Sequence, residues 1–580
     1  MDQKRMFLAI ALSIAILLGW QFVVRPMLPA PPAPVVTATP EPSAGQKPAA
    51  TASAAAMTAT AAVPREVPRV AIDAPRVHGS IALLGARIDD VVLRDYRETI
   101  APDSPQVRVL EPAADAQPYY VQFGWTLPPG AAAVKLPDGN SLWTATSPGP
   151  LTATHPLTLA WDNGAGLAFE IAISIDDNYM FQVSQSVRNA TAASVDLLPW
   201  ARIKRDYTPT TEGYYILHEG MLGVLNGRLQ ETKYSDAKKT GEAHDGVAYS
   251  ATSTGGWAGF TDKYWLVALV PDQTLASAVN FRHVSIDGHD GYQVDLATAA
   301  PQAVAAGATA TASTRLFAGA KVVRLLDRYE SADNIPNFDK AVDFGWFYFL
   351  TKPMFYALDF LYGLFGNFGL AIMGLTICVK ALFFPLANKA YRSMSRMKTL
   401  APKIQALRER LKDDPAKMQS EMMALYRAEK VNPASGCLPM VVQIPVFFSL
   451  YKVIFVTIEM RQAPFFGWIH DLSAIDPTNI FNLFGLLPFD PGELTPFLHL
   501  GVWPVIMGIT MWLQQKMNPP PPDPVQAKMF QFMPLIFTFM LARFPAGLVI
   551  YWSWNNTLTV LQQWLIMRQT RRLSATPARG

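Results

Sequence analysis

Cysteine is scarce in this sequence of 580 residues, where Cys378 and Cys437 are the two examples. Both lie in or beside apolar segments, which excludes a disulfide framework, a cysteine-based zinc site or a cysteine nucleophile from the more polar part of the chain. The sequence also lacks a GxxxxGK[ST] phosphate loop, an HExxH zinc helix and a GxSxG nucleophile elbow. We therefore expect no enzyme, cofactor or metal site, although a lone Ser, Lys or His acting as a catalyst stays open as an alternative.

Charge is scarce as well. Charged residues make up 16% of the chain and hydrophobic residues 50%, a balance typical of a protein with several transmembrane segments. The net charge of +3 is too small to indicate direct nucleic-acid recognition.

The N-terminal 25 residues combine a basic start with a long apolar run. Lys4 and Arg5 precede an apolar stretch over residues 6–24. This pattern predicts a transmembrane signal anchor over residues 1–25, with its N-terminus in the cytoplasm. A cleaved signal peptide is the alternative, but the apolar run is longer than the core of a typical signal peptide.

A linker and a large β domain follow the anchor. Residues 26–75 are rich in Pro, Ala and Thr, a composition that predicts a tether without a folded core. Residues 76–330 lack an apolar run of membrane length and show period-two alternation between turns, which predicts an antiparallel β-sandwich outside the cytoplasm. The example that we use below comprises Phe169, Ile171, Ile173 and Ile175, a turn at 176–178, then Phe181 and Val183.

The C-terminal part is predicted to lie mostly in the membrane. Residues 331–365 are aromatic and amphipathic, which suits an interfacial segment. A helical core over residues 366–570 then contains apolar runs that are read as membrane spans. The predicted spans are 366–387, 436–458, 499–515, 529–541 and 547–567, and with the anchor they make six transmembrane helices.

Charge placement orients these spans. Residues 388–435 hold eleven Lys or Arg and five acids, whereas residues 459–500 hold five acids and one Arg. The first loop is therefore predicted to be cytoplasmic and the second periplasmic. The basic tail at 571–580 agrees with this orientation, so both termini are predicted to be cytoplasmic.

The loop at residues 388–435 is predicted to form a basic helical hairpin. Its helices are predicted at 390–411 and 416–430, on either side of Asp413, Asp414 and Pro415. Five methionines lie in the two predicted helices of the hairpin. They either offer an adaptable surface to partners or pack the two helices together. They are Met394, Met397, Met418, Met422 and Met423.

Lys380 is the charged residue that stands out, because it lies inside the first span of this core. The span would be about 33 Å long as one helix, and an ammonium within it is costly unless it faces protein or water. No acid lies within the other core spans to act as its counter-ion, which favours a hydrated polar recess. The alternative is that Lys380 extends its amine to the nearer membrane surface. Lys452 lies nearer the outer end of its own span and could do so more easily, and we expect it to have a structural role.

Neutral polar residues are frequent in the same spans. Thr376 lies one turn before Lys380 on the same helix face, and Gln443 lies in the next span. The last span is the richest in amides and hydroxyls. Interhelical hydrogen bonding accounts for many of them, but it does not account for Lys380.

Several long segments carry a resemblance to a known family. The sequences LAPKIQALRERL, EMMALYRAEKVNP, RQAPF, WIHDLSAIDP and FPAGLVIYW resemble the YidC-type membrane protein insertases of Gram-negative bacteria. The resemblance is strongest over residues 344–567 and weaker in the β domain. It implies a five-helix core with a hydrophilic groove, an N-terminal anchor, and a periplasmic β-supersandwich.

The resemblance also implies which residues line the groove. The family's basic residue, usually arginine, corresponds to Lys380, so this chain keeps the charge but loses the planar guanidinium. Substrate-contacting positions correspond to Thr376, Ile444, Phe447, Tyr551 and Trp552, and Gln443 adjoins them. The family often has a second tyrosine at the position of Trp552.

The partners that the resemblance implies are nascent membrane proteins, the Sec translocon, the phospholipid bilayer, and ribosome and signal-recognition components at the hairpin. The implied location is the bacterial inner membrane. We expect a groove that shortens the low-dielectric path for a polar flank while the substrate's own apolar surface drives insertion. The competing hypotheses are a solute transporter with an anion site at Lys380 and a periplasmic scaffold, and deleting residues 80–320 would test the scaffold.

Overall fold

The computed structural model describes residues 67–211, 217–286, 288–411, 414–429, 438–487, 489, 491, 498–518 and 524–574. The predicted anchor and most of the predicted linker lie outside these residues. The first strand begins at Arg69, within the range predicted as linker.

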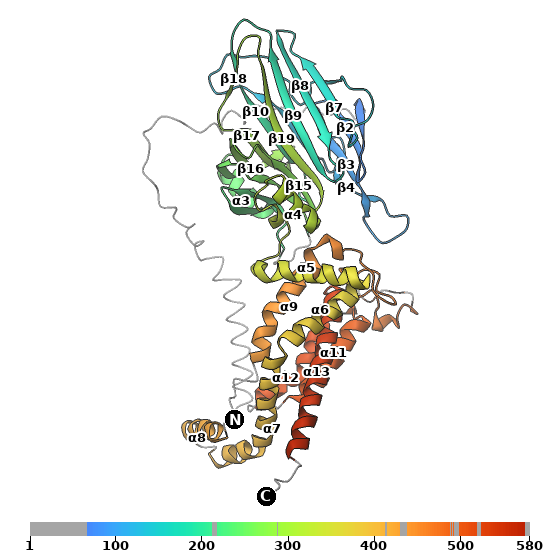
Figure 1. Ribbon diagram of the computed structural model, residues 1–580, viewed down its shortest axis with the longest axis vertical. Helices are drawn as coiled ribbons and strands as arrows, with labels where there is room; N and C mark the ends of the chain where they lie inside the picture. The colour runs from blue at the N-terminus through green and yellow to red at the C-terminus, as the bar shows by residue number, and fades with distance from the viewer. Residues whose placement is uncertain are drawn as a thin grey trace. The chain divides into compact units, whose positions relative to one another are not determined.

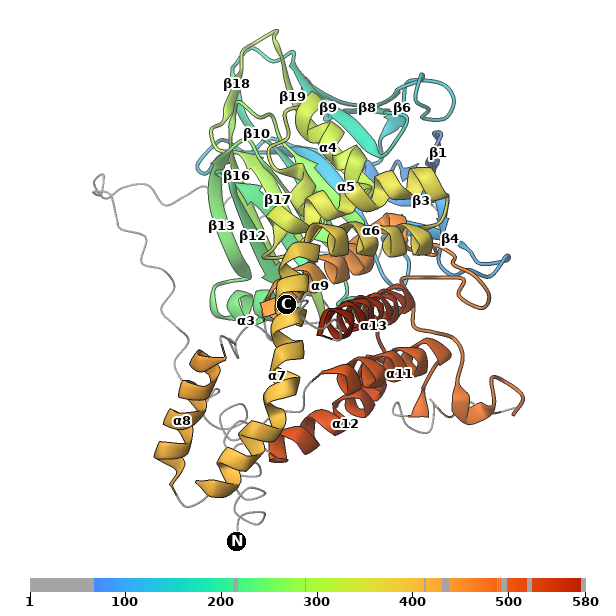
Figure 2. The ribbon, with the colours of Figure 1, turned by 60° about the horizontal axis from the view of Figure 1, so that its bottom comes forward.

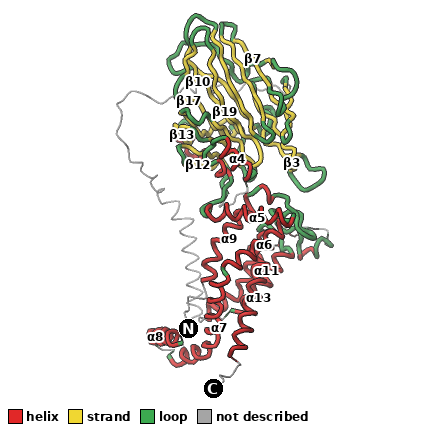
Figure 3. The backbone as a smooth tube through the Cα atoms, viewed as in Figure 1, coloured by secondary structure: helices red, strands yellow, loops and turns green. Residues whose placement is uncertain are grey.

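The β domain consists of two antiparallel sheets (Figures 1 and 3). One sheet has ten strands in the order β1-β2-β3-β5-β10-β17-β16-β13, with β18 paired to β10 and β4 to β3. The other has nine strands in the order β12-β11-β14-β15-β19-β9-β8-β7-β6. This arrangement confirms the predicted antiparallel sandwich.

The strands of the ten-stranded sheet are β1 (Arg69–Asp73), β2 (Val77–Ala82), β3 (Arg87–Arg97), β4 (Gln106–Leu110), β5 (Tyr119–Thr126), β10 (Val195–Arg205), β13 (Val247–Thr254), β16 (Ala276–Ile286), β17 (His289–Thr298) and β18 (Gln302–Val304). Those of the nine-stranded sheet are β6 (Thr144–Ala145), β7 (Leu157–Asp162), β8 (Leu167–Ile175), β9 (Met180–Asn189), β11 (Gly220–Leu225), β12 (Arg228–Lys233), β14 (Trp257–Thr261), β15 (Trp265–Val270) and β19 (Thr309–Ala320). A helix, α3 (Tyr234–Ala243), connects β12 to β13.

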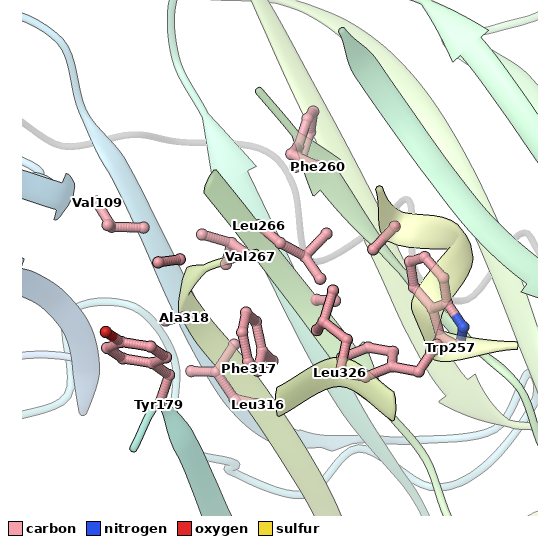
Figure 4. Close-up of a cluster of buried hydrophobic side chains, with 14 of the residues drawn as sticks. Val109, Tyr179, Trp257, Phe260, Leu266, Val267, Leu316, Phe317, Ala318 and Leu326 are labelled. Atoms are coloured by element: carbon pink, nitrogen blue, oxygen red, sulfur yellow. The ribbon is translucent and has the colours of Figure 1, made fainter. Parts of the chain in front are cut away.

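The alternation in sequence sets which face of each strand is buried. In β8 the apolar side chains at every second position from Leu167 to Ile175 are buried, and Phe181 and Val183 continue the pattern in β9. The strands pair with Ile173 opposite Val183, as a hairpin with a turn at 176–178 requires. Figure 4 shows the resulting core, where Phe317 of β19 lies among buried side chains that include Trp257 of β14.

The helices that follow the sandwich form the second part of the fold. They are α4 (Val323–Ala332), η4 (Phe338–Ala341), α5 (Tyr348–Phe365), α6 (Phe368–Leu382), α7 (Phe384–Arg410), α8 (Pro415–Ala428), α9 (Leu438–Val456), η6 (Ile458–Met460), η7 (Ile480–Asn482), α11 (Val502–Met517), α12 (Pro524–Leu541) and α13 (Ala546–Ser574). Helices α6, α11 and α9 each contact α13, and α5 contacts both α6 and α9 (Figure 2). Gly508 allows a close approach of α11 and α12, because a Cβ atom there would lie 2.0 Å from Thr538 Oγ1.

The predicted span at 366–387 is not one continuous helix, so that prediction was wrong. Helix α6 ends at Leu382 and α7 begins at Phe384, with a 66° bend between them. Pro385 explains the break, because it lacks an N–H and its ring would clash with the carbonyl of Ala381 in a straight helix. Among the described residues this bent pair passes a length-and-hydropathy test for a membrane span, and no single helix does.

Helix α5 covers the last part of the segment predicted at residues 331–365, of which the first part belongs to α4 and η4. Met354, Phe355 and Leu358 are buried on one side, while Phe349 and Phe360 are 75% and 64% exposed. Polar contacts hold the helix to the preceding elements. The ammonium of Lys352 lies 2.8 Å from Asp327 Oδ1 of α4 and also pairs with Asp339 of η4.

The predicted basic hairpin is present as α7 and α8. Helix α7 starts six residues before the predicted position 390, because it continues directly from the bend after α6. Met422 is buried between the helices with Leu400, Ile404 and Tyr426, and Met397 packs against this cluster. These two methionines therefore pack the hairpin, whereas Met423 is exposed.

The segment after α9 joins the helices to the β domain. Glu459 Oε1 accepts a hydrogen bond from the Val323 amide at the start of α4, with an N···O distance of 3.0 Å. The Oε2 atom of Glu459 is buried and has no hydrogen-bond partner among the described residues. Arg461 donates to the carbonyls of Arg97 and Glu98 at the end of β3.

Burial raises the pKa of Glu459 to about 7. The carboxylate of Asp359 adds to this effect, while the Val323 amide and the guanidinium of Arg324 oppose it. The neutral acid therefore predominates in the folded protein below pH 7.

We predict that truncation of Phe317 to alanine lowers the free energy of unfolding of the β domain by about 3–5 kcal/mol, because it leaves a cavity in the core. Pulse proteolysis of the full chain across a urea series measures this loss. Ile100→Ala is the matched control, since Ile100 is 58% exposed and its truncation is expected to change stability by less than about 0.5 kcal/mol. Equal effects of the two substitutions would contradict the core assignment.

We predict that the contact between α4 and the segment after α9 weakens as pH rises. The folded pKa of Glu459 lies above its unfolded value of about 4.5, so the folded state binds more protons between these values and stability falls across that window, by at most about 1.4 kcal/mol per pH unit. Glu459→Gln keeps the acceptor for Val323 and removes the titration. Limited proteolysis between pH 5 and 8 should show increasing cleavage for the wild type alone; parallel profiles for both proteins would exclude Glu459 as the cause.

Candidate functional site

Lys380 lies in the last turn of α6, immediately before the bend at Phe383. A cation at this position is favoured by the partial negative charge of the helix C-terminus. The side chain is half-buried and lines a cavity with a volume of about 10 Å³, enough for about one water molecule. The bend therefore places the basic residue at the end of one helix and inside the helical core.

The cavity is lined by side chains from four helices and combines apolar with neutral polar groups. Its residues are Met354 of α5; Leu375, Thr376, Val379 and Lys380 of α6; Gln443, Val446 and Leu450 of α9; and Tyr551 and Asn555 of α13. Four of the predicted groove residues, Thr376, Lys380, Gln443 and Tyr551, thus meet around one cavity.

The ammonium of Lys380 has a neutral partner. Its Nζ donates to Thr559 Oγ1 at 2.7 Å, and the Thr559 hydroxyl donates in turn to the carbonyl of Asn555 at 2.7 Å. No ion pair joins Lys380 to an acid within the part of the chain that the structure describes. The charge is oriented by hydrogen bonding without being neutralised, so it is available to an incoming anion.

Some of the remaining polar groups of the cavity have hydrogen-bond partners, and one acceptor does not. Gln443 Nε2 donates to the Tyr551 hydroxyl at 2.6 Å, and the Thr376 hydroxyl donates to the carbonyl of Ile372 at 2.7 Å. The Oδ1 atom of Asn555 is buried and lacks a hydrogen-bond partner among the described residues. An unsatisfied acceptor beside an ammonium makes the cavity suited to a polar guest or to water.

Three predicted residues lie outside the cavity lining. Phe447 packs against Trp552 with ring centroids 4.7 Å apart and against Tyr551 at 6.4 Å. Trp552 also contacts Phe537 of α12 at 5.9 Å. Ile444 is 48% exposed and faces away from the cavity lining. Tyr551 therefore separates a polar recess from an aromatic surface, and one substrate path along all seven residues remains a prediction.

Asn555, Thr559 and Met354 complete the site but were absent from the predicted set. Tyr551, Asn555, Thr559 and Gln563 recur every four residues of α13 and so share one helix face. That spacing is visible in the sequence and could have identified Asn555 and Thr559. The contribution of Met354 depends on how α5 packs against α6 and α9, which no local pattern reveals.

Lys452 pairs with an acid instead of extending its amine to the membrane surface. Its Nζ lies 2.9 Å from Asp343 Oδ2, and its side chain is 11% exposed. Asp343 also accepts a hydrogen bond from the His218 amide of the β domain. The ion pair gives Lys452 a structural role at the start of the helical region.

Comparison with known proteins covers both parts of the fold. Residues 360–573 match the family model described as 60Kd inner membrane protein, and residues 69–357 match the YidC periplasmic domain. A membrane protein insertase YidC from Granulibacter bethesdensis is 60% identical over 98% of each chain. The corresponding protein of Acidiphilium cryptum is 56% identical over 87% of this chain and 85% of its own.

A solved structure, an active YidC insertase with its first transmembrane domain resolved, covers 86% of this chain and 93% of its own at 18% identity and a TM-score of 0.35. The sequence relatives, at 50–60% identity, favour membrane protein insertion over solute transport as the activity. The chain belongs to the YidC family of membrane protein insertases.

Proposed function

We propose that the cavity around Lys380 is the polar end of a groove that receives the hydrophilic flank of a nascent membrane segment. The observation that carries this proposal is the half-buried ammonium whose hydrogen-bond partner is the neutral hydroxyl of Thr559. If the role of Lys380 were structural, we would expect an acidic partner for it, such as Asp343 is for Lys452. Lys380 instead keeps its charge available for an acidic residue of the substrate.

The energetics of insertion make such a charge useful. An Asp at the centre of a membrane helix costs about 2.5–3.5 kcal/mol, whereas each Leu, Ile, Phe or Val gains about 0.3–0.6 kcal/mol. One acidic residue in transit therefore offsets the gain from about seven apolar ones. An ammonium about 4 Å away returns about 4 kcal/mol at an effective dielectric constant of about 20, so it lowers the barrier without a nucleotide or cofactor.

The apolar part of the substrate needs a different surface. Phe447 and Trp552 form an aromatic pair beside Tyr551, and Ile444 adds an exposed side chain on α9. In our proposal the incoming helix passes along these residues into lipid while its polar flank occupies the recess. Burial of the substrate's own apolar surface in the bilayer supplies the favourable free energy.

The proposed topology follows the charge distribution. Six transmembrane helices, with both termini in the cytoplasm and the sandwich in the periplasm, agree with the basic loop 388–435 and the acidic segment 459–500. In this arrangement the α7–α8 hairpin faces the cytoplasm, where ribosome and signal-recognition components would reach it. The Sec translocon would act beside the helical core on larger substrates.

We predict that Lys380→Ala abolishes insertion of a short single-span substrate with an acidic N-terminal tail, whereas Lys380→Arg supports it, because the charge is the required property. Protease protection of the tail in liposomes containing the purified protein measures insertion. Lys238→Ala, which removes an exposed lysine of the β domain, is the matched control and should insert normally. Full protection with Lys380→Ala would assign Lys380 a role in packing.

We predict that Thr559→Val reduces insertion of the same acidic substrate several-fold, since it removes the hydroxyl that orients the ammonium, and that Thr559→Ser restores it. A substrate with a neutral tail should be affected much less by Thr559→Val. Equal loss for acidic and neutral tails would indicate a general defect in helix packing instead of a lost charge interaction.

A further inference from the structure

The connection between α9 and α11 presents an apolar loop that the groove does not use. We call residues 479–487 together with 489 the Phe484 loop. No charged residue lies between Asp476 and Asp490. Its large side chains are exposed, with exposed fractions of 39% for Phe481, 52% for Leu483, 61% for Phe484, 81% for Leu486, 39% for Leu487 and 48% for Phe489. Contiguous apolar exposure of this kind marks an interaction surface.

The backbone of the loop is strained at two of its exposed apolar residues. Leu483 and Phe484 have φ angles of 52° and 61°, in the left-handed region that bulky residues rarely adopt. The strained turn keeps two apolar side chains directed outward, an arrangement that a role in water does not explain.

The peptide N–H groups of the loop, by contrast, form hydrogen bonds within the loop itself. Seven of its N–H groups donate within the loop, from Phe481 to Asn479 Oδ1, from Leu483 to Ile480 O, from Phe484 to Asn479 O, from Gly485 to Asn482 O, from Leu486 to Leu483 O, from Leu487 to Asn482 O and from Phe489 to Leu487 O. Apolar side chains outside and hydrogen-bonded amides inside are what a segment in contact with hydrocarbon requires.

The base of the loop is fixed to the start of α11. Asp476 Oδ2 accepts from the Trp503 amide at 2.9 Å, and Thr478 Oγ1 accepts from the Val502 amide at 3.0 Å. The connection lies beside the first turn of this helix (Figure 2). Further along α11, Ile509 and Trp512 are 60% and 49% exposed, so the loop continues an apolar surface of the helical core.

We propose that the Phe484 loop inserts into the interfacial region of the periplasmic leaflet and so binds lipid directly. Residues 459–500, which contain the loop, hold one Arg and no Lys, and this scarcity of basic residues favours the periplasmic side. Anchoring to α11 sets the depth of insertion, and insertion removes the exposed side chains from water, which offsets the strain at Leu483 and Phe484. The loop thereby fixes the height of α11 relative to the membrane surface.

Spin-label accessibility tests this proposal in vesicles of pure phospholipid, where no partner protein is present. Cys378→Ser and Cys437→Ser give a cysteine-free background, into which Leu486→Cys is introduced and labelled with a nitroxide. Leu275→Cys, at a position of the β domain that is 53% exposed, is the aqueous control, and Ile509→Cys on α11 is the lipid control. Power saturation compares collision with oxygen, which partitions into lipid, and with a water-soluble nickel chelate.

The expected oxygen-to-nickel ratio at residue 486 is several-fold above that at residue 275 and approaches that at residue 509. A ratio at 486 equal to that at 275, with a lipid-like value at 509, would overturn the proposal and point to a protein partner for the loop. The inference rests on the membrane placement proposed above, which an aqueous value at 509 would overturn separately. Phe484→Cys repeats the test if the first variant does not fold.

Discussion

An ammonium that forms no ion pair among the described residues of an apolar helical core is the constraint on which the arrangement of this insertase depends. Lys380 is tolerable there because the bend at Pro385 ends α6 just after it, and because Thr559 and the helix C-terminus orient the charge. Polar groups of two further helices, α9 and α13, then face the same cavity. A neutral residue at 380 would remove the reason for this polar lining, whereas an acid on α13 would neutralise the charge.

In the proposed mechanism, the charge and the apolar surface act on different parts of an amphipathic substrate. Gln443 and Tyr551 form the hydrogen-bonded boundary between the recess and the aromatic pair of Phe447 and Trp552. The polar flank and the apolar helix of a substrate can therefore be held on opposite sides of one side chain. Lysine suits such a site as a mobile point charge, while it gives up the bidentate geometry of arginine.

Polar contacts connect the β domain, and the helix α4 that follows it, to the core. Glu459 binds the first amide of α4, Arg461 binds the end of β3, and Lys352 of α5 pairs with Asp327 of α4. Because α5 also places Met354 at the cavity, the amphipathic helix touches both the β domain's terminal elements and the site. These contacts couple the packing of the cavity to the domain outside it.

Patterns of short range predicted much of this structure. Alternation at 169–183 predicted the hairpin of β8 and β9, and the Asp414-Pro415 sequence predicted the break between α7 and α8. Features that depend on contacts between distant segments could not be predicted from such patterns. Pro385 is visible in the sequence, but a proline within an apolar run is compatible with either a kinked or a broken helix. Which side of Tyr551 each aromatic residue occupies depends on the rotation of α9 against α13, and the number of transmembrane helices remains a prediction.

Direct contact between the cavity and a substrate in transit is the most decisive observation. In the background without Cys378 and Cys437, Thr376→Cys is combined with ribosome-bound nascent chains that carry one cysteine in an acidic tail. The account predicts a disulfide between residue 376 and the tail at intermediate chain lengths, lost when insertion is complete, and none for Leu275→Cys. Efficient insertion without a crosslink at 376 at any chain length would contradict the assignment of this cavity as the groove.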